Sequence, residues 1–494
     1  PRCNNGLLLH LGSDPGCNVD AMARAVVVGS GPNGLAGAVA LARAGLDVTV
    51  LEARDTVGGG SRTEELTLPG VLHDVCSAVH PFAAASPFLA SLPLAEHGLE
   101  WCLPEVDLVH VLDGGRAGVM VRSLDETVAG LGEDGRAWRR TFGPIAGHFP
   151  ALAGEILRPI QQRFPRHPLR LASFGLRGLL PATTLARRWR TDEARGLFAG
   201  AAAHAFHPLT APTTSAIGLA LIGSGHHVGW PVARGGSRAI GDALVSLLES
   251  LGGKVETGTT VTSLDDLPPA DAVLLDLAPR GVLDVAGDAL PPRVARAYRR
   301  YRYGPAAWKV DLAVEGGVPW TAEPARRAGT VHVGGTLEEI AAAERDVHRG
   351  RMPADPFLLV GQQYLADPSR SVGDVHPVWA YAHVPHGYDG DATEAVIDRI
   401  EHFAPGLRDR IVGRHVAGPA AIEAGNANFV GGDIATGAAD PRQVLFRPRL
   451  AFDPYATGIP GVFICSAATP PGAGVHGMGG FHAARSALRH LRLG

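Results

Sequence analysis

A chain of 494 residues, at roughly 150 residues per domain, has room for two or three domains and a large buried core. Hydrophobic residues make up 46% of it and charged residues 19%, which excludes a disordered or fibrous protein. Lys and Arg total 45 against 49 Asp and Glu, a formal net charge of −4. Without a basic field to attract polyanions, we expect no nucleic-acid partner.

The five cysteines are odd in number, widely spaced and without a CxxC pair, which argues against a disulfide framework and a zinc site. No apolar run approaches the roughly 18 residues of a membrane span, and no signal peptide is recognisable. We therefore expect a cytoplasmic protein that binds no metal. Residues 1–22 lack periodicity and Met22 precedes a clear strand pattern, so we expect a disordered leader with Met22 as the natural start.

A nucleotide-binding pattern follows this leader. Residues 24–29 form the β-branched run of a buried parallel strand. The strand leads into a stretch that satisfies GxGxxG, namely Gly29-Ser30-Gly31-Pro32-Asn33-Gly34. An Ala/Leu helix is expected over 35–44, and a second strand over 47–51 ends at Glu52.

Each residue type in this pattern has a physical reason. Gly29 permits a tight turn, Gly31 lets the backbone approach a pyrophosphate, and Gly34 allows close packing of helix on strand. The helix N-terminus then faces the phosphates, and Glu52 lies near the spacing at which a carboxylate accepts the ribose hydroxyls. In this context the pattern predicts dinucleotide binding.

A second glycine-rich turn follows Glu52 and Ala53. It contains Gly59-Gly60-Ser61-Arg62. A second turn here is typical of flavoproteins, whose longer cofactor runs on past the first helix, and it would bring Arg62 near the pyrophosphate or the flavin. The alternative for Arg62 is a surface cation. The pattern favours FAD over NAD.

Three blocks together resemble the phytoene-desaturase-like FAD-dependent oxidoreductases, within the wider group that includes amine oxidases and protoporphyrinogen oxidase. The first is 29–62, and the second, 235–261, looks like the helix and strand that return Val261 to the adenine. The third, 459–484, reads IPGVFICSAATPPGAGVHGMGGFHAA and resembles the closing strand, turn and helix of the carotenoid-desaturase branch. The nearest likeness is to the branch grouped with pyridine nucleotide-disulfide oxidoreductase-domain proteins.

The resemblance implies an α/β fold, in which a Rossmann-type, glutathione-reductase-like FAD-binding domain is interleaved with an α+β substrate domain. The expected FAD-binding segments are 23–110, 230–290 and 437–494, and the expected substrate or cap segments are 111–229 and 291–436. In the closing block Ser466 and Gly477-Met478-Gly479 would adjoin the cofactor. Free N–H groups at the start of the last helix would stabilise negative charge on reduced flavin.

The segments between these blocks are less informative. Residues 125–190 are helical, apolar and basic, which fits either peripheral docking on a membrane or an ordinary solvated cap. Strands are expected at 306–314, 356–363 and 378–383, as a sheet beneath the substrate cavity. There is no second nucleotide fingerprint, so the expected electron acceptor is oxygen, a quinone or a carrier protein.

Histidines are the candidate proton acceptors, since their pKa lies near neutrality. His476 lies in the flavin-facing turn and His80 in the loop after the second glycine-rich turn; a base and a structural hydrogen bond are both open for each. Four others lack metal-ligand spacing and are expected to line the middle domain: His204, His207, His226 and His227.

The sequence thus predicts an FAD-dependent oxidoreductase, phytoene dehydrogenase-like and acting on CH–CH bonds. It would desaturate a small hydrophobic substrate, with isoprenoids and polyenes as candidates, by hydride transfer to flavin. Two alternatives stay open: amine or porphyrinogen oxidation on the same scaffold, and a flavin-binding regulatory protein without turnover. Amine oxidation would call for an aromatic cage beside the flavin, and the closing block holds no Trp or Tyr.

Overall fold

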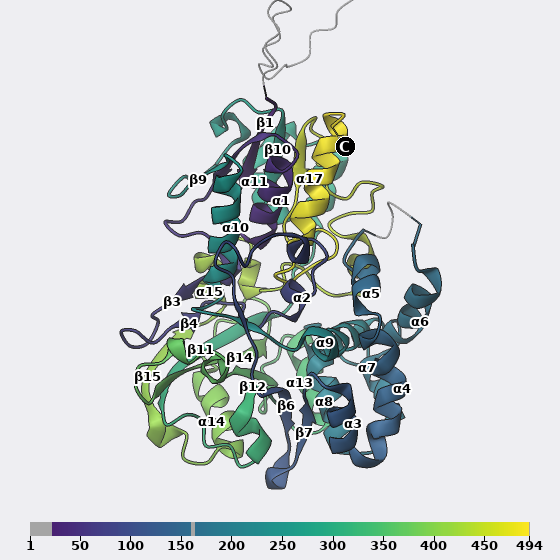
Figure 1. Ribbon diagram of the computed structural model, residues 1–494, viewed down its shortest axis with the longest axis vertical. Coiled ribbons are helices and arrows are strands. Elements are labelled where there is room, and N and C mark those ends of the chain that lie inside the picture. Colours follow the sequence, from purple (N-terminus) through teal and green to yellow (C-terminus); the bar gives the residue numbers. More distant parts are fainter. Residues whose placement is uncertain (1–21, 160–163, 494) are drawn as a thin grey trace, which may run out of the picture.

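Two large sheets form the frame of the molecule, one above the other in Figure 1. The computed structural model describes residues 22–159 and 164–493, so the expected leader lies outside the described residues except for Met22. Within those ranges no helix combines the length and apolarity needed to cross a membrane.

The upper sheet is parallel, with the strand order β16-β10-β1-β2-β9. Its strands are β1 (Arg24–Val28), β2 (Asp47–Leu51), β9 (Lys254–Glu256), β10 (Ala272–Leu275) and β16 (Val462–Ile464). Ala25 and Val27 of β1 belong to one core cluster and Val26 and Val28 to another. Both faces are therefore covered, as parallel sheets require.

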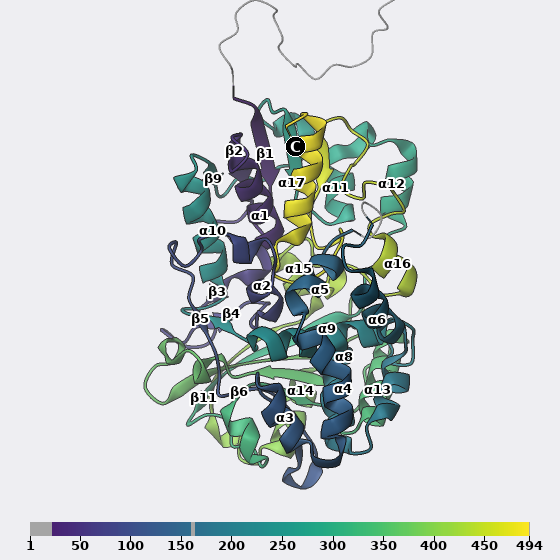
Figure 2. The same ribbon diagram turned by 45° about the vertical axis from the view of Figure 1, so that its right-hand side comes forward.

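Helices from distant parts of the chain cover this sheet. One face carries α1 (Pro32–Ala42), α10 (Arg238–Ser250) and α17 (Met478–His490), and the other carries α11 (Pro279–Ala286) and α12 (Pro292–Arg299). Figure 2 shows α1 and α17 side by side although they stand at opposite ends of the chain. The predicted Rossmann-type α/β architecture is confirmed.

The lower sheet has the order β15-β11-β14-β13-β12-β6-β7 and is antiparallel except for the β12–β6 pair. Its strands are β6 (Val106–Val111), β7 (Ala117–Met120), β11 (Ala306–Glu315), β12 (Ala328–Val333), β13 (Leu358–Gly361), β14 (Val375–Val384) and β15 (Ile411–Ala417). The three expected strands correspond to β11, β13 and β14. The other four were not anticipated.

Most of the remaining helices gather on one side of the lower sheet (Figure 2). They are α3 (Leu124–Gly130), α4 (Gly135–Ala146), α5 (Phe149–Ile156), α6 (Pro168–Gly178), α7 (Ala182–Leu185), α8 (Asp192–Ala203) and α9 (Thr214–Val228). The expected helical character of 125–190 is thus confirmed. Leu169 and Leu176 of α6 are exposed on a helix that also carries Arg170. Membrane docking by this stretch stays a prediction.

Two expected boundaries differ from the structure. The boundary at residue 110 falls inside β6, which pairs with β12 and β7 in the lower sheet. The segment expected to end at 290 continues into α12, because Val294 and Tyr298 pack in the core of the upper sheet. The helix and strand expected within 235–261 correspond to α10 and β9, and 259–262 follows them as an irregular segment beside the cavity.

Candidate functional site

A cavity of about 950 Å³ runs from the carboxyl ends of β1, β2 and β10 to the lower sheet. Its far end is lined by Thr330 of β12, Leu359 of β13, and Trp379 and Tyr381 of β14. Ligands of open α/β sheets bind outside the carboxyl ends of the strands. The volume lies at the upper end of the range for cofactor and ligand pockets.

The glycine-rich loop after β1 forms one wall of the cavity. Gly29, Ser30, Gly31, Pro32 and Asn33 all line it. Gly29 has φ of +99°, and a Cβ at Gly34 would lie 2.1 Å from the carbonyl oxygen of Gly29. Their roles in the tight turn and in close packing are therefore as expected. Gly34 itself lies under the loop and does not line the cavity.

The carboxylate of Glu52 closes the loop from the end of β2. Its Oε2 accepts the N–H and the hydroxyl of Ser30 at 2.8 and 2.6 Å, and its Oε1 accepts the Arg54 N–H at 2.9 Å. Two carboxylate oxygens have about four acceptor sites. Glu52, which lines the cavity with Ala53, keeps capacity for a further hydroxyl.

Arg62 is fixed beside the cavity by two carbonyl groups. Its Nε donates to the carbonyl of Gly59 at 3.1 Å and its Nη2 to that of Gly425 at 2.9 Å. A Cβ at Gly59 would lie 3.0 Å from Cα of Gly31, so the two glycine-rich turns are in contact. Gly59, Gly60 and Arg62 line the cavity, whereas Ser61 is buried and donates to the carbonyl of Gly58.

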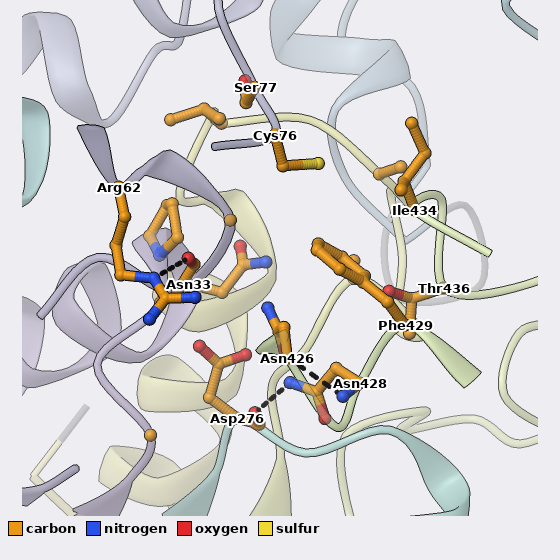
Figure 3. A pocket seen from close by; sticks show the side chains of 18 of the residues that line it. Asn33, Arg62, Cys76, Ser77, Asp276, Asn426, Asn428, Phe429, Ile434 and Thr436 are labelled. Atoms are coloured by element: carbon orange, nitrogen blue, oxygen red, sulfur yellow. Dashed lines mark hydrogen bonds between the residues drawn. The ribbon is translucent and has the colours of Figure 1, made fainter. Parts of the chain in front are cut away.

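The opposite wall was not assigned from the sequence. Figure 3 shows Asp276, Asn426 and Asn428 around the same space as Arg62, with Phe429 across from it. Asn428 Nδ2 donates to the carbonyl of Asp276 at 2.8 Å. In the sequence, Asp276 is marked only by its position directly after the short apolar run 272–275.

Asp276 lies directly beneath the glycine-rich loop. Its Oδ2 accepts the Gly34 N–H at 2.9 Å, and a Cβ at Gly31 would lie 2.6 Å from the same oxygen. Burial raises the pKa of Asp276 to about 7, the Gly34 hydrogen bond opposes this rise, and Glu52 adds to it. The carboxyl therefore titrates near neutral pH at the expected pyrophosphate position.

The closing block approaches the cavity differently from the expectation. Ala473, Gly474 and Val475 line it, together with Ala467, whereas the expected Ser466, Gly477, Met478 and Gly479 do not. The N–H groups of Met478 and Gly479 are also not free, since they donate to His476 Nδ1 and Asn33 Oδ1. The reason is that α17 packs on α1, where a Cβ at Gly480 would lie 1.7 Å from the carbonyl oxygen of Asn33.

The two candidate histidines differ in position. His476 is buried outside the cavity lining, and burial lowers its pKa to about 4, so its neutral ring accepts the Met478 N–H. His476 thus makes a structural hydrogen bond of the kind considered. His80 lines the cavity, contacts the Ser237 hydroxyl through Nε2 at 2.8 Å, and has a pKa lowered to about 4 by burial.

Of the remaining residues singled out from the sequence, only some lie at the cavity. Val261 and His204 line the cavity, whereas His207, His226 and His227 do not. His226 Nε2 accepts from Trp138 Nε1 at 3.1 Å. In the part of the chain that the structure describes, no three His, Cys, Asp or Glu side chains are grouped as a metal site would need.

A buried ion pair holds the loop that leads to His80. Arg370 donates through Nη1 to Asp74 at 2.5 Å and through Nε to Asp367 at 3.2 Å, and all three side chains are almost fully buried. Asp74 also accepts the Thr63 hydroxyl and the Ser237 N–H. One buried cation thus joins the carboxylates of two segments that lie far apart in the sequence.

A smaller cavity of about 320 Å³ adjoins the first and shares Arg62, Cys76 and Trp379 with it. Its wall includes Lys309, whose ammonium pairs with the buried Asp311. Burial pushes the pKa of Asp311 up, but Lys309 and neighbouring histidines lower it overall. The buried lysine is therefore charge-compensated.

Aromatic side chains gather at the far end of the main cavity. The ring centroids of Trp379 and Tyr381 are 4.9 Å apart at an interplanar angle of 84°, and Phe206 stacks on Tyr381 at 6.1 Å. Trp230 lines the same region. The aromatic residues that the closing block lacks are supplied by β14 and the α8–α9 region.

Comparison with known proteins gives the same architecture. Residues 27–91 match the NAD(P)-binding Rossmann-like domain family. Proteins of mouse and rat called pyridine nucleotide-disulfide oxidoreductase domain-containing protein 2 are 23% and 24% identical to the chain, over 95% of it and 94% of each of them.

Solved structures show the same fold over nearly the whole chain. Putrescine oxidase bound to putrescine has a TM-score of 0.59 at 18% identity, covering 96% of this chain and 99% of that one. Cyclohexylamine oxidase from Brevibacterium oxydans has a TM-score of 0.56 at 16% identity, with 96% and 99% covered. An oxidoreductase from Methanosarcina mazei has a TM-score of 0.59 at 16% identity, covering 94% of this chain and 100% of that one. Residues 27–91 are thus similar to an NAD(P)-binding Rossmann-like domain, and the chain as a whole shares the fold of these solved structures, with a mixed-sheet second domain.

Proposed function

We propose that the protein is an FAD-dependent oxidoreductase that dehydrogenates a small, largely apolar molecule by hydride transfer to the flavin. The observation that carries the proposal is the continuity of one cavity from the dinucleotide-type loop at Gly29 to the aromatic end at Trp379. A dinucleotide bound at the loop would place its redox ring toward the apolar end.

The residues present fit the cofactor. Gly31 has no side chain at the point where a Cβ would contact Asp276, so the loop backbone stays open there. Glu52 has acceptor capacity for ribose hydroxyls, and Arg62 supplies a cation near the second turn. Bound flavin would supply a two-electron acceptor. The chain itself would orient the substrate and exclude water. His80, whose ring is neutral at neutral pH because its pKa is lowered, would take part in this as a lining residue.

Amine oxidation is the second candidate. The edge-to-face pair of Trp379 and Tyr381 favours it, because aromatic faces bind an amine-bearing carbon chain well. We propose oxygen, a quinone or a carrier protein as the acceptor that reoxidises the flavin in either case.

The absorption spectrum of the purified protein tests the cofactor. We expect the two visible bands of oxidised flavin and release of FAD on heating, identified by mass. Anaerobic addition of apolar dehydrogenation substrates, and separately of primary amines, should then show which class bleaches the flavin. A colourless protein that takes up no added FAD would overturn the proposal and favour a role without turnover.

The affinity for FAD is expected to weaken as the pH rises. Asp276, with its raised pKa of about 7, is neutral below that pH and ionised above it, where its charge opposes the diphosphate. The negative charge of Glu52 adds to the rise in the pKa of Asp276. One linked proton limits the change in Kd to about tenfold per pH unit.

Quenching of FAD fluorescence from about pH 6 to pH 9 measures this dependence. Asp276→Asn should flatten the curve and bind FAD more tightly than the wild type at the alkaline end. Asp284→Asn, which also changes a carboxylate in the cavity lining, should keep the wild-type slope. Equal slopes in wild type and Asp276→Asn would show that Asp276 is not the linked group.

A further inference from the structure

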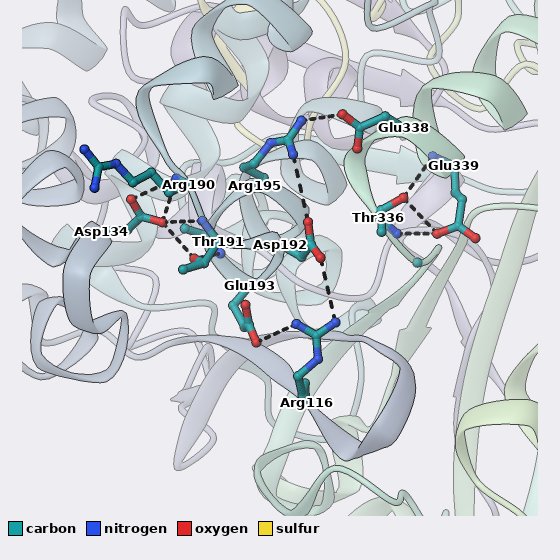
Figure 4. Close-up of polar contacts among 12 residues, drawn as sticks. Arg116, Asp134, Arg190, Thr191, Asp192, Glu193, Arg195, Thr336, Glu338 and Glu339 are labelled. Carbon is teal, nitrogen blue, oxygen red and sulfur yellow. Dashed lines mark hydrogen bonds and ion pairs between the residues drawn. The ribbon is translucent and has the colours of Figure 1, made fainter.

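His204 lies at the far end of the cavity, directly after the last residue of α8. Its ring packs edge-on against Trp230, with centroids 6.0 Å apart. The other end of α8 is anchored by polar contacts (Figure 4), in which Asp134 accepts from the backbone of Arg190 and Thr191, and Glu193 pairs with Arg116. His204 thus follows a helix whose start is anchored, and its own ring is held against Trp230.

A second histidine is in contact with His204. Nε2 of His204 and Nε2 of His332, on β12, are 3.1 Å apart. Burial lowers the pKa of His204 to about 3 and that of His332 well below its ordinary value. Both rings are therefore neutral at neutral pH, and each carries one N–H. In their contact one Nε2 must donate and the other accept.

The surroundings of His332 decide which ring donates. Its ring lies against the backbone of α8, where a Cβ at Gly200 would be 2.4 Å from Nδ1, and that Nδ1 is buried without a partner. A buried orphan N–H is rarer in proteins than a buried unused acceptor. The proton of His332 is therefore on Nε2, which donates to His204.

His204 then carries its own proton on Nδ1. This nitrogen has no hydrogen-bond partner among the described residues, and it does not belong to the fully buried unpartnered atoms. The residue is half-buried and lines the cavity. Its Nδ1–H is therefore a donor without a partner among the described residues, on a side chain that lines the cavity, and His332 fixes it in that form.

We propose that His204 Nδ1–H is a ligand-binding donor of the cavity, and that the molecule bound there is largely apolar but carries an acceptor oxygen, such as a ketone carbonyl. Identifying this molecule as the substrate rests on the proposed function. A pure hydrocarbon would fill the aromatic end but leave the N–H unpaired, and a site built around a donor rejects analogues that lack the matching acceptor.

A matched pair of probes tests the proposal on the holoprotein. 4-Phenylbutan-2-one and butylbenzene share a benzene ring and a four-carbon chain and differ in the carbonyl group. Their Kd values can be measured from the perturbation of the flavin spectrum. We expect the ketone to bind about tenfold more tightly, as one net hydrogen bond allows.

Two variants locate the donor. His204→Phe keeps a ring but removes the N–H, so the ratio of the two Kd values should fall to about one. His227→Phe changes a histidine outside the cavity lining and should keep the wild-type ratio. A hydrocarbon that binds the wild type as tightly as the ketone would overturn the proposal, and so would a ketone preference that survives in His204→Phe.

The proton position can be read independently. Long-range ¹⁵N spectra of histidine-labelled protein should show His204 protonated on Nδ1, and His332→Phe, which removes the positioning ring, should shift this state toward a mixture. A His204 protonated on Nε2 in the wild type would contradict the inference. If the protein holds no flavin, the same Kd ratio can be measured by thermal shift. An incorrect cofactor assignment can therefore be distinguished from an incorrect assignment of His204 as the donor.

Discussion

Gly480→Ala should prevent stable packing of α17 on α1 and abolish FAD retention. A Cβ at this position would lie 1.7 Å from the carbonyl oxygen of Asn33 and 2.7 Å from the Gly37 nitrogen. Both neighbours are backbone atoms, so the clash cannot be relieved by a rotamer change. We expect a loss of stability at or beyond about 3 kcal/mol, the upper end of ordinary overpacking.

Thermal unfolding and bound FAD per chain measure this effect. Gly175→Ala is the matched control, because Gly175 lies inside α6 and a Cβ there would meet nothing within 4 Å. That change should be neutral or stabilising by about 1 kcal/mol through helix propensity. A Gly480→Ala protein with wild-type midpoint and FAD content would show that the two helices are not packed as described.

Arg370→Leu is expected to be equally severe. It leaves the carboxylates of Asp74 and Asp367 buried without their cation, and breaking a buried pair from one side costs about 3–5 kcal/mol. The double variant Arg370→Leu with Asp74→Asn should recover part of the loss, because it removes one uncompensated charge. Arg234→Leu, which removes a half-exposed pair with Glu100, should lower the unfolding midpoint far less than Arg370→Leu.

The pH dependence gives a sharper test of Arg370→Leu. Burial pushes the pKa of Asp74 up, but Arg370 and the hydrogen bonds of Ser237 and Thr63 outweigh it, so the pKa is lowered overall. This group's stability contribution is present above the unfolded pKa and is lost as the pH falls through the folded one.

Without Arg370 the burial effect is unopposed and the pKa of Asp74 rises. The gap in unfolding midpoint between wild type and Arg370→Leu should therefore be widest near about pH 8 and narrow toward about pH 5, where the carboxyl takes up a proton. A gap that does not change with pH would mean that the loss comes from packing of the arginine and not from its charge.

Local patterns were sufficient for the first strand–helix–strand unit of the upper sheet. The β1–turn–α1–β2 order, the need for glycine at Gly29 and Gly34, and the position of Glu52 beside the cavity all follow from residues that are close in sequence. Three strands of the lower sheet, β11, β13 and β14, were also recognisable, because alternating or continuous apolar runs are local signals. These parts needed no knowledge of distant contacts.

Short and distant elements were not recognisable in the same way. Strand β10 has four residues, too few for a periodic signal, yet it adjoins β1 and delivers Asp276 beneath the loop. The parallel pairing of β6 with β12 joins segments about half the chain apart, and no local pattern encodes it. For the same reason the boundary at residue 110 was misplaced.

The sequence by itself indicated a glycine-rich entry into the last helix, which the resemblance assigned to the cofactor. Only the tertiary structure decided what those glycines meet: at Gly480 it is the backbone of α1, because two helices pack where no side chain fits. The aromatic end and the His204–His332 contact were likewise decided by the fold, since Trp230, Trp379 and the two histidines come from distant segments that meet at the lower sheet. Features that depend on residues close in sequence can be recognised from the sequence. Contacts between distant segments are known only from the folded structure.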